Sequence, residues 1–448
     1  MQLLLQRFPT SLFGTSFLLT FARLAGAGVG ILLQIVIARH YGAQSLGIYY
    51  QALSLAAIFS VFISVGYPWI VAPIVAAKEA DNSPELLSNF LTQAFKDTFA
   101  ISILLGIPLA LAIWYSGYFG ADERVALLVG LLTAPVYVVM RMMGGIANAL
   151  KHFQLANLPE LLLRPTLILA IVSFAVIFQL HLGAVSIVTI NLIVSVALAT
   201  YMVSALGGAI DLSFGRSSAQ DQPAAEKSRL RKLAVPMIFS TLFINMFADL
   251  DILIVSMILP TSETGIFGVC MKIAALLVFA VQVTHQILLR DASDAHRTSD
   301  KMKMQSIIGK ANRIAIASSI LSFLVILFFG KLLLGIFGQE FLTGYYCLLG
   351  LSLAQFIRAA FGPAIQILMI TGHQRAGIPV YIGSLIVLVV CNLILVPAYG
   401  YEGAAIAVII TTLFWSVWLN RLVKQKSGYG ISIFSTENLP IGSKLAKR

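Results

Sequence analysis

The stretch LFGTSFLLTFARLAGAGVGILLQIVI, residues 12–37, decides the fold class. It contains a single charged residue, Arg23. A transmembrane helix needs about 20 mostly apolar residues, so this stretch is long enough to cross a bilayer. It is also longer than the apolar core of a secretory signal peptide, and no small-residue cleavage site follows it. We therefore interpret it as the first transmembrane helix.

Similar apolar runs fill the rest of the chain. Hydrophobic residues make up 59% of the 448 residues and charged residues only 11%, whereas a soluble domain has roughly a quarter charged. The mean hydropathy is +0.91. The sequence thus predicts an all-α, polytopic membrane protein with about twelve transmembrane helices. The other eleven are expected near 46–76, 97–118, 125–149, 160–180, 183–206, 233–259, 264–289, 311–337, 346–371, 377–397 and 402–424.

The basic residues indicate how the chain is oriented. Nearly all Lys and Arg residues outside the helices, Arg164 among them, fall at one set of helix ends and loops, and the other side holds only Arg39, Arg124 and Lys331. By the positive-inside rule both termini are cytoplasmic, in a bacterial inner membrane. The same rule accounts for the net charge of +11 without nucleic acid.

A polar stretch divides the chain into two halves of six helices. We predict an N-terminal lobe at 1–206, a cytoplasmic linker at 207–232, a C-terminal lobe at 233–424 and a cytoplasmic tail at 425–448. Three short patterns recur at similar offsets, which indicates a repeat. Because six is even, the repeats are parallel, related by a pseudo-two-fold axis normal to the membrane. The paired patterns are Gly47-Ile48-Tyr49 with Gly265-Ile266-Phe267, Arg141 and Gly145 with Arg358 and Gly362, and Gly183-Ala184 with Gly403-Ala404.

Charges inside predicted helices are costly, about 2.5–3.5 kcal/mol each at the bilayer centre, and mark candidate sites. Arg23 shares one helix face with Thr20, Ala27, Gly30 and Gln34. This polar or small face fits a wet cavity in which Arg23 binds an anionic head group. Alternatively, Arg23 caps carbonyls or pairs with a buried acid. The run GAGVG at 26–30 lies within the helix and is interpreted as a close-packing site, not a nucleotide loop.

The seventh and eighth predicted helices carry charges of both signs. Asn245 and Asp249 share a face, and Asp251 points about 160° away. One carboxylate is expected to pair with Lys272, while the other faces a cavity. These acids are candidates for carrying a coupling proton or cation; a neutralised structural ion pair is the alternative. Lys272 lies deep in its helix and is a candidate substrate-binding residue.

Arg141 and Arg358 occupy equivalent places in the two halves. Asn148 follows Arg141 on the same face, and Gln355 precedes Arg358 by one turn. Substrate binding, a gate and helix packing all remain open for these arginines. Together with Arg23 and Lys272 they outnumber the two embedded acids, so a wet cavity lined by them attracts anions, phosphates in particular.

Nothing in the sequence indicates catalysis. There is no nucleophile elbow, HExxH motif or P-loop. Cys270, Cys347 and Cys391 lie in apolar runs without zinc or disulfide spacing. We therefore expect neither an enzyme nor a metal or cofactor.

Three segments carry a family resemblance. They are ARLAGAGVGILLQIVIARHYGAQSLGIYYQALSL (22–55), GIANALKHF (145–153) and PAYGYEGAAIA (397–407). The chain resembles the Wzx-type polysaccharide flippases, in the superfamily that also contains multidrug and toxin extrusion antiporters and lipid II flippases. The resemblance implies two six-helix lobes around a cationic cavity. It also implies a polyprenyl-pyrophosphate-linked oligosaccharide substrate, moved from the cytoplasmic to the periplasmic leaflet. Arg23 and Lys272 match positions that contact pyrophosphate in related flippases, but the cation often found on the second helix is absent.

This resemblance points to the biosynthesis of O-antigen, capsule or exopolysaccharide. The implied partners are the polyprenyl-pyrophosphate-linked glycan and membrane lipids, with a polysaccharide polymerase and a chain-length regulator as candidate protein partners. Two rival functions remain open. A cation-coupled multidrug extruder would need an acidic cavity, and a membrane polymerase or ligase would need a large periplasmic loop.

Overall fold

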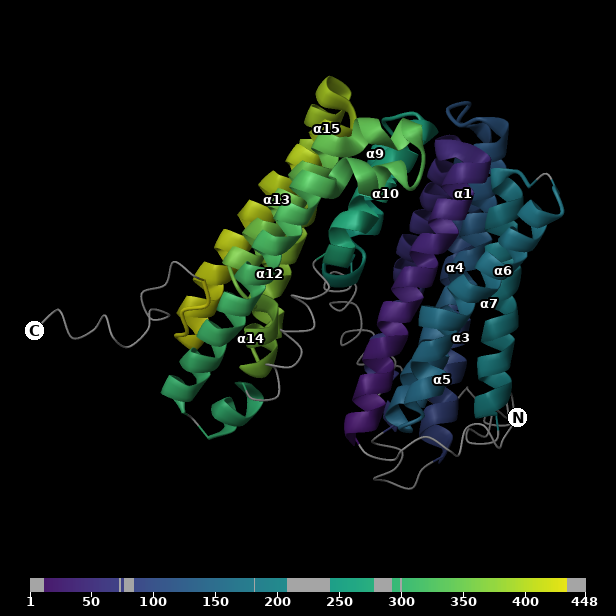
Figure 1. Ribbon diagram of the computed structural model, residues 1–448. Helices are drawn as coiled ribbons and strands as arrows, with labels where there is room; N and C mark the ends of the chain where they lie inside the picture. The colour runs from purple at the N-terminus through teal and green to yellow at the C-terminus, as the bar shows by residue number, and fades with distance from the viewer. Residues whose placement is uncertain are drawn as a thin grey trace, which may run out of the picture. The chain divides into compact units, whose positions relative to one another are not determined.

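The computed structural model describes residues 12–71, 74–75, 84–180, 182–207, 242–277, 292–298 and 300–432, and these contain helices and no strand. Figure 1 traces them in chain order. The chain forms two compact units, Met1–Leu242 and Phe243–Arg448. The boundary falls inside the predicted seventh helix, 233–259. Nearly all of the predicted linker, 207–232, lies outside the described residues.

Eight described helical segments are long and apolar enough to cross a membrane. Two of them hold two crossings each. The helix α1 (Leu12–Ile63) would be about 78 Å long if straight, more than twice the thickness of a bilayer core, and Gly42 breaks it with a φ of 78°. The helix α15 (Ile378–Ser427) breaks likewise at Gly400, with a φ of 59°. With the described parts of the seventh and eighth helices, these segments confirm an all-α membrane protein of about twelve crossings.

The N-terminal unit is built around α4 (Ala121–Ala149), which packs on α1, on α3 (Pro84–Tyr115) and on α7 (Ala184–Leu206). Gly130 of α4 lies against the backbone of Ala52, so the two helices approach closely there. The fifth crossing begins at Phe153, earlier than the predicted 160. It consists of α5 (Phe153–Leu158), the π-helix η2 (Pro159–Leu163) and α6 (Arg164–Ile177).

The C-terminal unit has α13 at its centre, packed on α12 and α15. The break between α13 and α14 falls at Gly362, with a φ of 78°, and Pro363. Besides α15, the elements of this unit are α9 (Phe247–Ser256), α10 (Thr261–Leu277), α12 (Lys301–Gly335), η3 (Gln339–Gly344), α13 (Tyr345–Ala360), α14 (Ala364–Ile370) and η4 (Gln374–Gly377).

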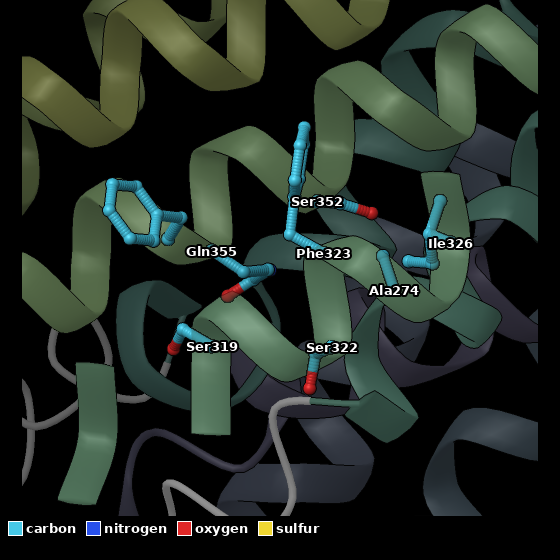
Figure 2. Close-up of a pocket in the computed structure, with 8 residues that line it drawn as sticks. Ala274, Ser319, Ser322, Phe323, Ile326, Ser352 and Gln355 are labelled. Atoms are coloured by element: carbon cyan, nitrogen blue, oxygen red, sulfur yellow. The ribbon is translucent and has the colours of Figure 1, made fainter. Parts of the chain in front are cut away.

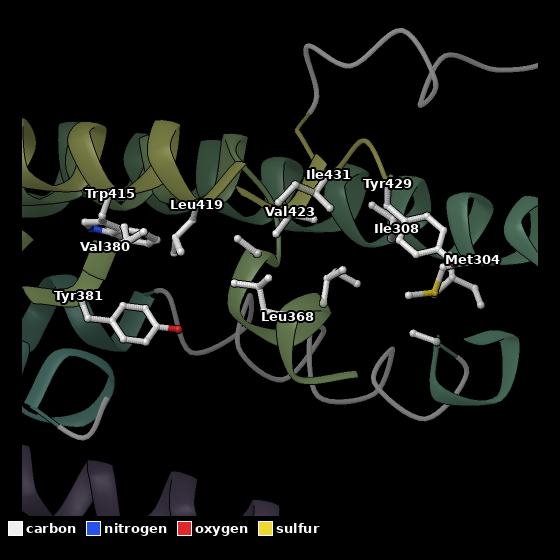
Figure 3. Close-up of a cluster of buried hydrophobic side chains, with 14 of the residues drawn as sticks. Met304, Ile308, Leu368, Val380, Tyr381, Trp415, Leu419, Val423, Tyr429 and Ile431 are labelled. Carbon is white, nitrogen blue, oxygen red and sulfur yellow. The ribbon is translucent and has the colours of Figure 1, made fainter. Parts of the chain in front are cut away.

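The chain turns back into this unit after α15. Gly428 ends the helix with a left-handed φ of 73°, and residues 429–432, which we name the C-terminal clasp, lie buried behind it. Figure 3 shows Tyr429 and Ile431 of the clasp in one apolar cluster with Val423. From α12, the Gln305 and Asn312 side-chain amides donate hydrogen bonds to the carbonyls of Gly430 and Ile431. Within the predicted cytoplasmic tail, 425–448, residues 425–427 thus belong to α15 and residues 429–432 form the clasp.

Candidate functional site

The predicted polar face of the first helix is open in the structure. Arg23 is exposed, and a side-chain carbon built on Gly28 or Gly30 would meet no atom within 4 Å. Gln34 is half-buried, and its Oε1 accepts a hydrogen bond of 2.7 Å from the Tyr50 hydroxyl across the turn at Gly42. The side chain of Thr20 lies outside the described residues.

Close packing in the glycine run is confirmed at Gly26 and is wrong at Gly28 and Gly30. A side chain on Gly26 would collide with the backbone carbonyl of Leu161 in η2. Helix α1 therefore contacts the π-helix of the fifth crossing directly, one turn away from Arg23.

Arg141 is half-buried in α4 and is held by a neutral partner. Its Nη1 donates a hydrogen bond of 2.8 Å to the Ser60 hydroxyl oxygen, while the Ser60 hydroxyl donates to the Ala57 carbonyl. No carboxylate of the described residues pairs with Arg141. Asn148 is exposed, and its Oδ1 accepts a hydrogen bond from Asn157 of α5. The guanidinium thus keeps donors available for a further anion.

Arg164, which the sequence analysis assigns to a cytoplasmic helix end, lies inside the helical segment of the fifth crossing and is a further functional candidate. Because the fifth crossing begins at Phe153 and ends at Ile177, Arg164 lies about 16 Å along it, near its middle. Its guanidinium lies 4.8 Å from the centre of the Tyr137 ring. The Tyr137 hydroxyl accepts a hydrogen bond from Asn191 of α7. Glu160, half-buried in η2, also joins the charged residues of this crossing.

The C-terminal unit holds the predicted acids. Asp251 of α9 is fully buried, and its Oδ1 accepts a hydrogen bond of 2.8 Å from the Asn392 side chain of α15. Among the residues that the structure describes, the other carboxylate oxygen of Asp251 and the amide oxygen of Asn392 have no hydrogen-bond partner. Asp251 is therefore held by an amide that the sequence did not indicate, and not by Lys272. Asp249 is half-buried and Asn245 is exposed.

Lys272 and Arg358 are both half-buried in this unit. The guanidinium of Arg358 lies 5.8 Å from the centre of the Trp415 ring, a cation–π contact. No ion pair joins either residue to a carboxylate in the part of the chain that is described.

A small pocket with polar and apolar lining residues lies between α10, α12 and α13. Figure 2 shows Ser319, Ser322, Ser352 and Gln355 around it. The hydroxyls of Ser319 and Ser352 donate to carbonyls of their own helices at 2.7 Å, so their oxygens remain free to accept. The Gln355 Oε1 has no partner. The pocket therefore suits water or another hydrogen-bond donor, one turn from Arg358.

The structure distributes the selected residues over both units. Arg23, Gln34, Arg141 and Asn148 belong to the N-terminal unit, and Asn245, Asp249, Asp251, Lys272 and Arg358 to the C-terminal unit. Within each unit, some embedded charges contact neutral side chains, as Arg141 contacts Ser60 and Asp251 contacts Asn392. At Asp97 of α3, the Tyr67 hydroxyl and the Gln93 amide both donate to the carboxylate.

Comparisons with known proteins identify the architecture. No family model matches the chain. A curated protein of Haloferax volcanii, described as a probable low-salt glycan biosynthesis flippase, Agl15, is 22% identical over 191 residues. The match covers 41% of this chain and 40% of that relative, so it spans less than half the length of either.

Solved structures match over nearly the whole chain. An inward-facing multidrug resistance MATE family transporter of the MOP superfamily has a TM-score of 0.74 at 15% identity, covering 91% of this chain and 99% of its own. The lipid II flippase MurJ, in an inward closed conformation, has a TM-score of 0.74 at 14% identity, covering 91% of this chain and 87% of MurJ. A MOP superfamily transporter from Pyrococcus furiosus, with a binding pocket described as of reverse polarity, has a TM-score of 0.61 at 15% identity. That match covers 92% of this chain and 96% of the transporter. This multi-pass membrane protein therefore has the fold of the MOP superfamily transporters.

Proposed function

We propose that this chain is a flippase that moves a polyprenyl-pyrophosphate-linked oligosaccharide from the cytoplasmic to the periplasmic leaflet. It works by alternating access in the bacterial inner membrane, with both termini cytoplasmic, in O-antigen, capsule or exopolysaccharide biosynthesis. The MOP fold, the partial match to a glycan flippase and the embedded cations support this proposal.

The environment of Arg141 is the observation that carries the proposal. A guanidinium stays protonated at all physiological pH values, so burial cannot neutralise it. In α4 it is half-buried and bonded to the neutral Ser60 hydroxyl. A membrane-embedded charge of this kind is costly and therefore marks a candidate ligand-binding site. Pyrophosphate is a suitable ligand because guanidinium groups bind its oxygens in pairs.

The membrane potential supplies a driving force for such a substrate. Moving two negative charges outward across an inside-negative membrane is favourable by about 2.3 kcal/mol per charge per 100 mV. We assign the resetting step to a proton or cation at Asp251. Its unpartnered carboxylate oxygen and the unpartnered Asn392 amide oxygen are both acceptors, and a bound cation would satisfy them together.

A cation-coupled multidrug antiporter is the second candidate. Two observations favour it: the structural match to a MATE family transporter and the buried Asp251, a suitable coupling group. Such an extruder takes cationic or aromatic substrates, so it predicts binding of cationic dyes. A membrane polymerase or ligase is a third, weaker candidate.

Complementation of a bacterial strain that lacks its own oligosaccharide flippase tests the proposal. We expect Arg23→Ala and Arg141→Gln to abolish surface polysaccharide at normal protein abundance. Lys331→Gln, at an exposed cation outside the candidate site, is the matched control and should retain activity. Full activity in both arginine variants, or export of cationic dyes with no glycan flipping, would refute the proposal.

Proteoliposomes test the driving force separately. Flipping of the lipid-linked oligosaccharide should accelerate when an inside-negative potential is imposed. A rate that ignores both the potential and ion gradients would exclude the coupling described for Asp251, without touching the substrate assignment.

A further inference from the structure

The helix of the fifth crossing carries a cation directly after a helical turn with unusual geometry. Arg164 begins α6 directly after the five-residue π-helix η2, and its backbone N–H bonds to the Pro159 carbonyl. π-Helical turns inside α-helices are rare and frequently coincide with functional sites. Pro165 follows and has no N–H to donate, which weakens the regular helical bonding of the preceding turn.

This irregular turn is fixed against the helix that bears Arg23. The Leu161 carbonyl of η2 packs on Gly26, where any side chain would collide. Arg23 lies one turn before Gly26, and Arg164 lies one turn after Leu161. The two cations therefore belong to one tightly packed pair of helices within the N-terminal unit.

The Arg164 side chain is oriented by α4. Its guanidinium stacks over the ring of Tyr137, whose hydroxyl accepts a hydrogen bond of 3.1 Å from Asn191. Tyr137 and Asn191 are 5% and 1% exposed, so this support is rigid, while Arg164 itself is only half-buried. A cation–π contact of this kind holds the guanidinium beside the ring, and a guanidinium can bind the oxygens of an oxyanion in pairs.

A second arginine follows on the same face of α4. Arg141 lies four residues after Tyr137, so both point to the same side of that helix. The N-terminal unit thus holds three embedded arginines, 23, 141 and 164. One phosphate needs one or two guanidinium groups, and a pyrophosphate with two phosphates accommodates more.

We propose that Arg164 is an additional substrate-binding residue, which contacts the pyrophosphate oxygens of the lipid carrier from the fifth crossing. The inference rests on the proposed function and specifies a ligand group that the sequence analysis did not select. The competing role is structural, a fixed counter-charge for Glu160 one turn earlier in the same crossing.

Affinity for a soluble analogue separates the two roles. Full-length protein in detergent is titrated with farnesyl pyrophosphate, and the binding constant and thermal unfolding midpoint are measured for each variant. Losing charge-assisted hydrogen bonds from one guanidinium should weaken binding about tenfold to a hundredfold in Arg164→Gln. Arg164→Lys keeps the positive charge but loses the paired N–H donors of the guanidinium. Its affinity should therefore lie between those of wild type and Arg164→Gln. Lys331→Gln, which removes a cation lying 5.4 Å from the Tyr345 ring centre, is the control and should bind like wild type.

The outcomes are distinct. If Arg164→Gln and Glu160→Gln lower the unfolding midpoint equally and leave the affinity unchanged, Arg164 is structural and the inference is overturned. If Arg23→Ala weakens binding and both Arg164 variants do not, the inference fails while the proposed function stands. If wild-type protein does not bind the prenyl pyrophosphate, the proposed function itself fails. Should Arg164→Gln not fold, the affinity of Arg164→Lys decides in its place.

Discussion

The C-terminal clasp predicts a thermodynamic coupling that can be measured. Asn312 of α12 is 2% exposed, and its Nδ2 donates a hydrogen bond of 2.5 Å to the carbonyl of the fully buried Ile431. In Asn312→Ala this carbonyl loses its buried donor, which costs about 1–3 kcal/mol of folding free energy. Removing residues 429–448 costs more, because Tyr429 and Ile431 each contribute about 1.5–3 kcal/mol through burial.

The effects of Asn312→Ala and of the truncation on the free energy of unfolding should not add. Asn312→Ala acts through the clasp, so in the truncated protein it has no bond left to break, and its effect on the unfolding midpoint should vanish. Thermal unfolding in detergent, followed by the fluorescence of Trp415 in the same apolar cluster, measures all four proteins. Arg313→Ala, an exposed neighbour on α12, is the control and should change nothing. An equal loss of stability in full-length and truncated Asn312→Ala would refute this account.

Two further predictions concern the membrane helices. Gly26→Ala places a methyl group against the Leu161 carbonyl and should destabilise the protein by about 1–3 kcal/mol. Gly28→Ala, at an open position, is the control and should fold like wild type. If Gly28→Ala had the lower unfolding midpoint of the two, the packing of Gly26 on η2 would be contradicted. Asp251→Asn keeps an acceptor for the Asn392 amide but removes the charge, so abundance should stay normal while transport in proteoliposomes loses its dependence on the ion gradient. A retained gradient dependence would remove Asp251 from the coupling step.

The number of crossings could be predicted from the sequence because hydropathy is a local property. A bilayer-length apolar run is visible without any knowledge of neighbours, and no lipid-exposed alternative to a helix satisfies its backbone. Helix breaks within the apolar segments are harder to predict. The ends of the first and second crossings merge at Gly42, and those of the last two at Gly400, so glycine conformation and not hydropathy marks these turns.

The start of the fifth helix could not be predicted from hydropathy. Asn157 and Glu160 lower the hydropathy of residues 153–160, so the sequence predicts a fifth helix that starts at 160, with Arg164 near its cytoplasmic end. The helical segment in the structure begins at Phe153, so Arg164 lies well inside the helix. The association of Asp251 with Asn392, 141 residues apart, carries no signal in a single sequence.

Under the proposed function, the neutral partners of Arg141 and Arg358 matter for substrate binding. If Arg141 were paired with a carboxylate, an incoming phosphate would have to displace that acid, and the gain in binding would largely cancel. Ser60 and the Trp415 ring instead hold Arg141 and Arg358 without neutralising them. Asn392 likewise holds the Asp251 side chain through a neutral amide. Under the proposed function, each of the two arginines is oriented in advance and keeps its positive charge, so an anionic substrate can bind and leave without breaking a permanent ion pair.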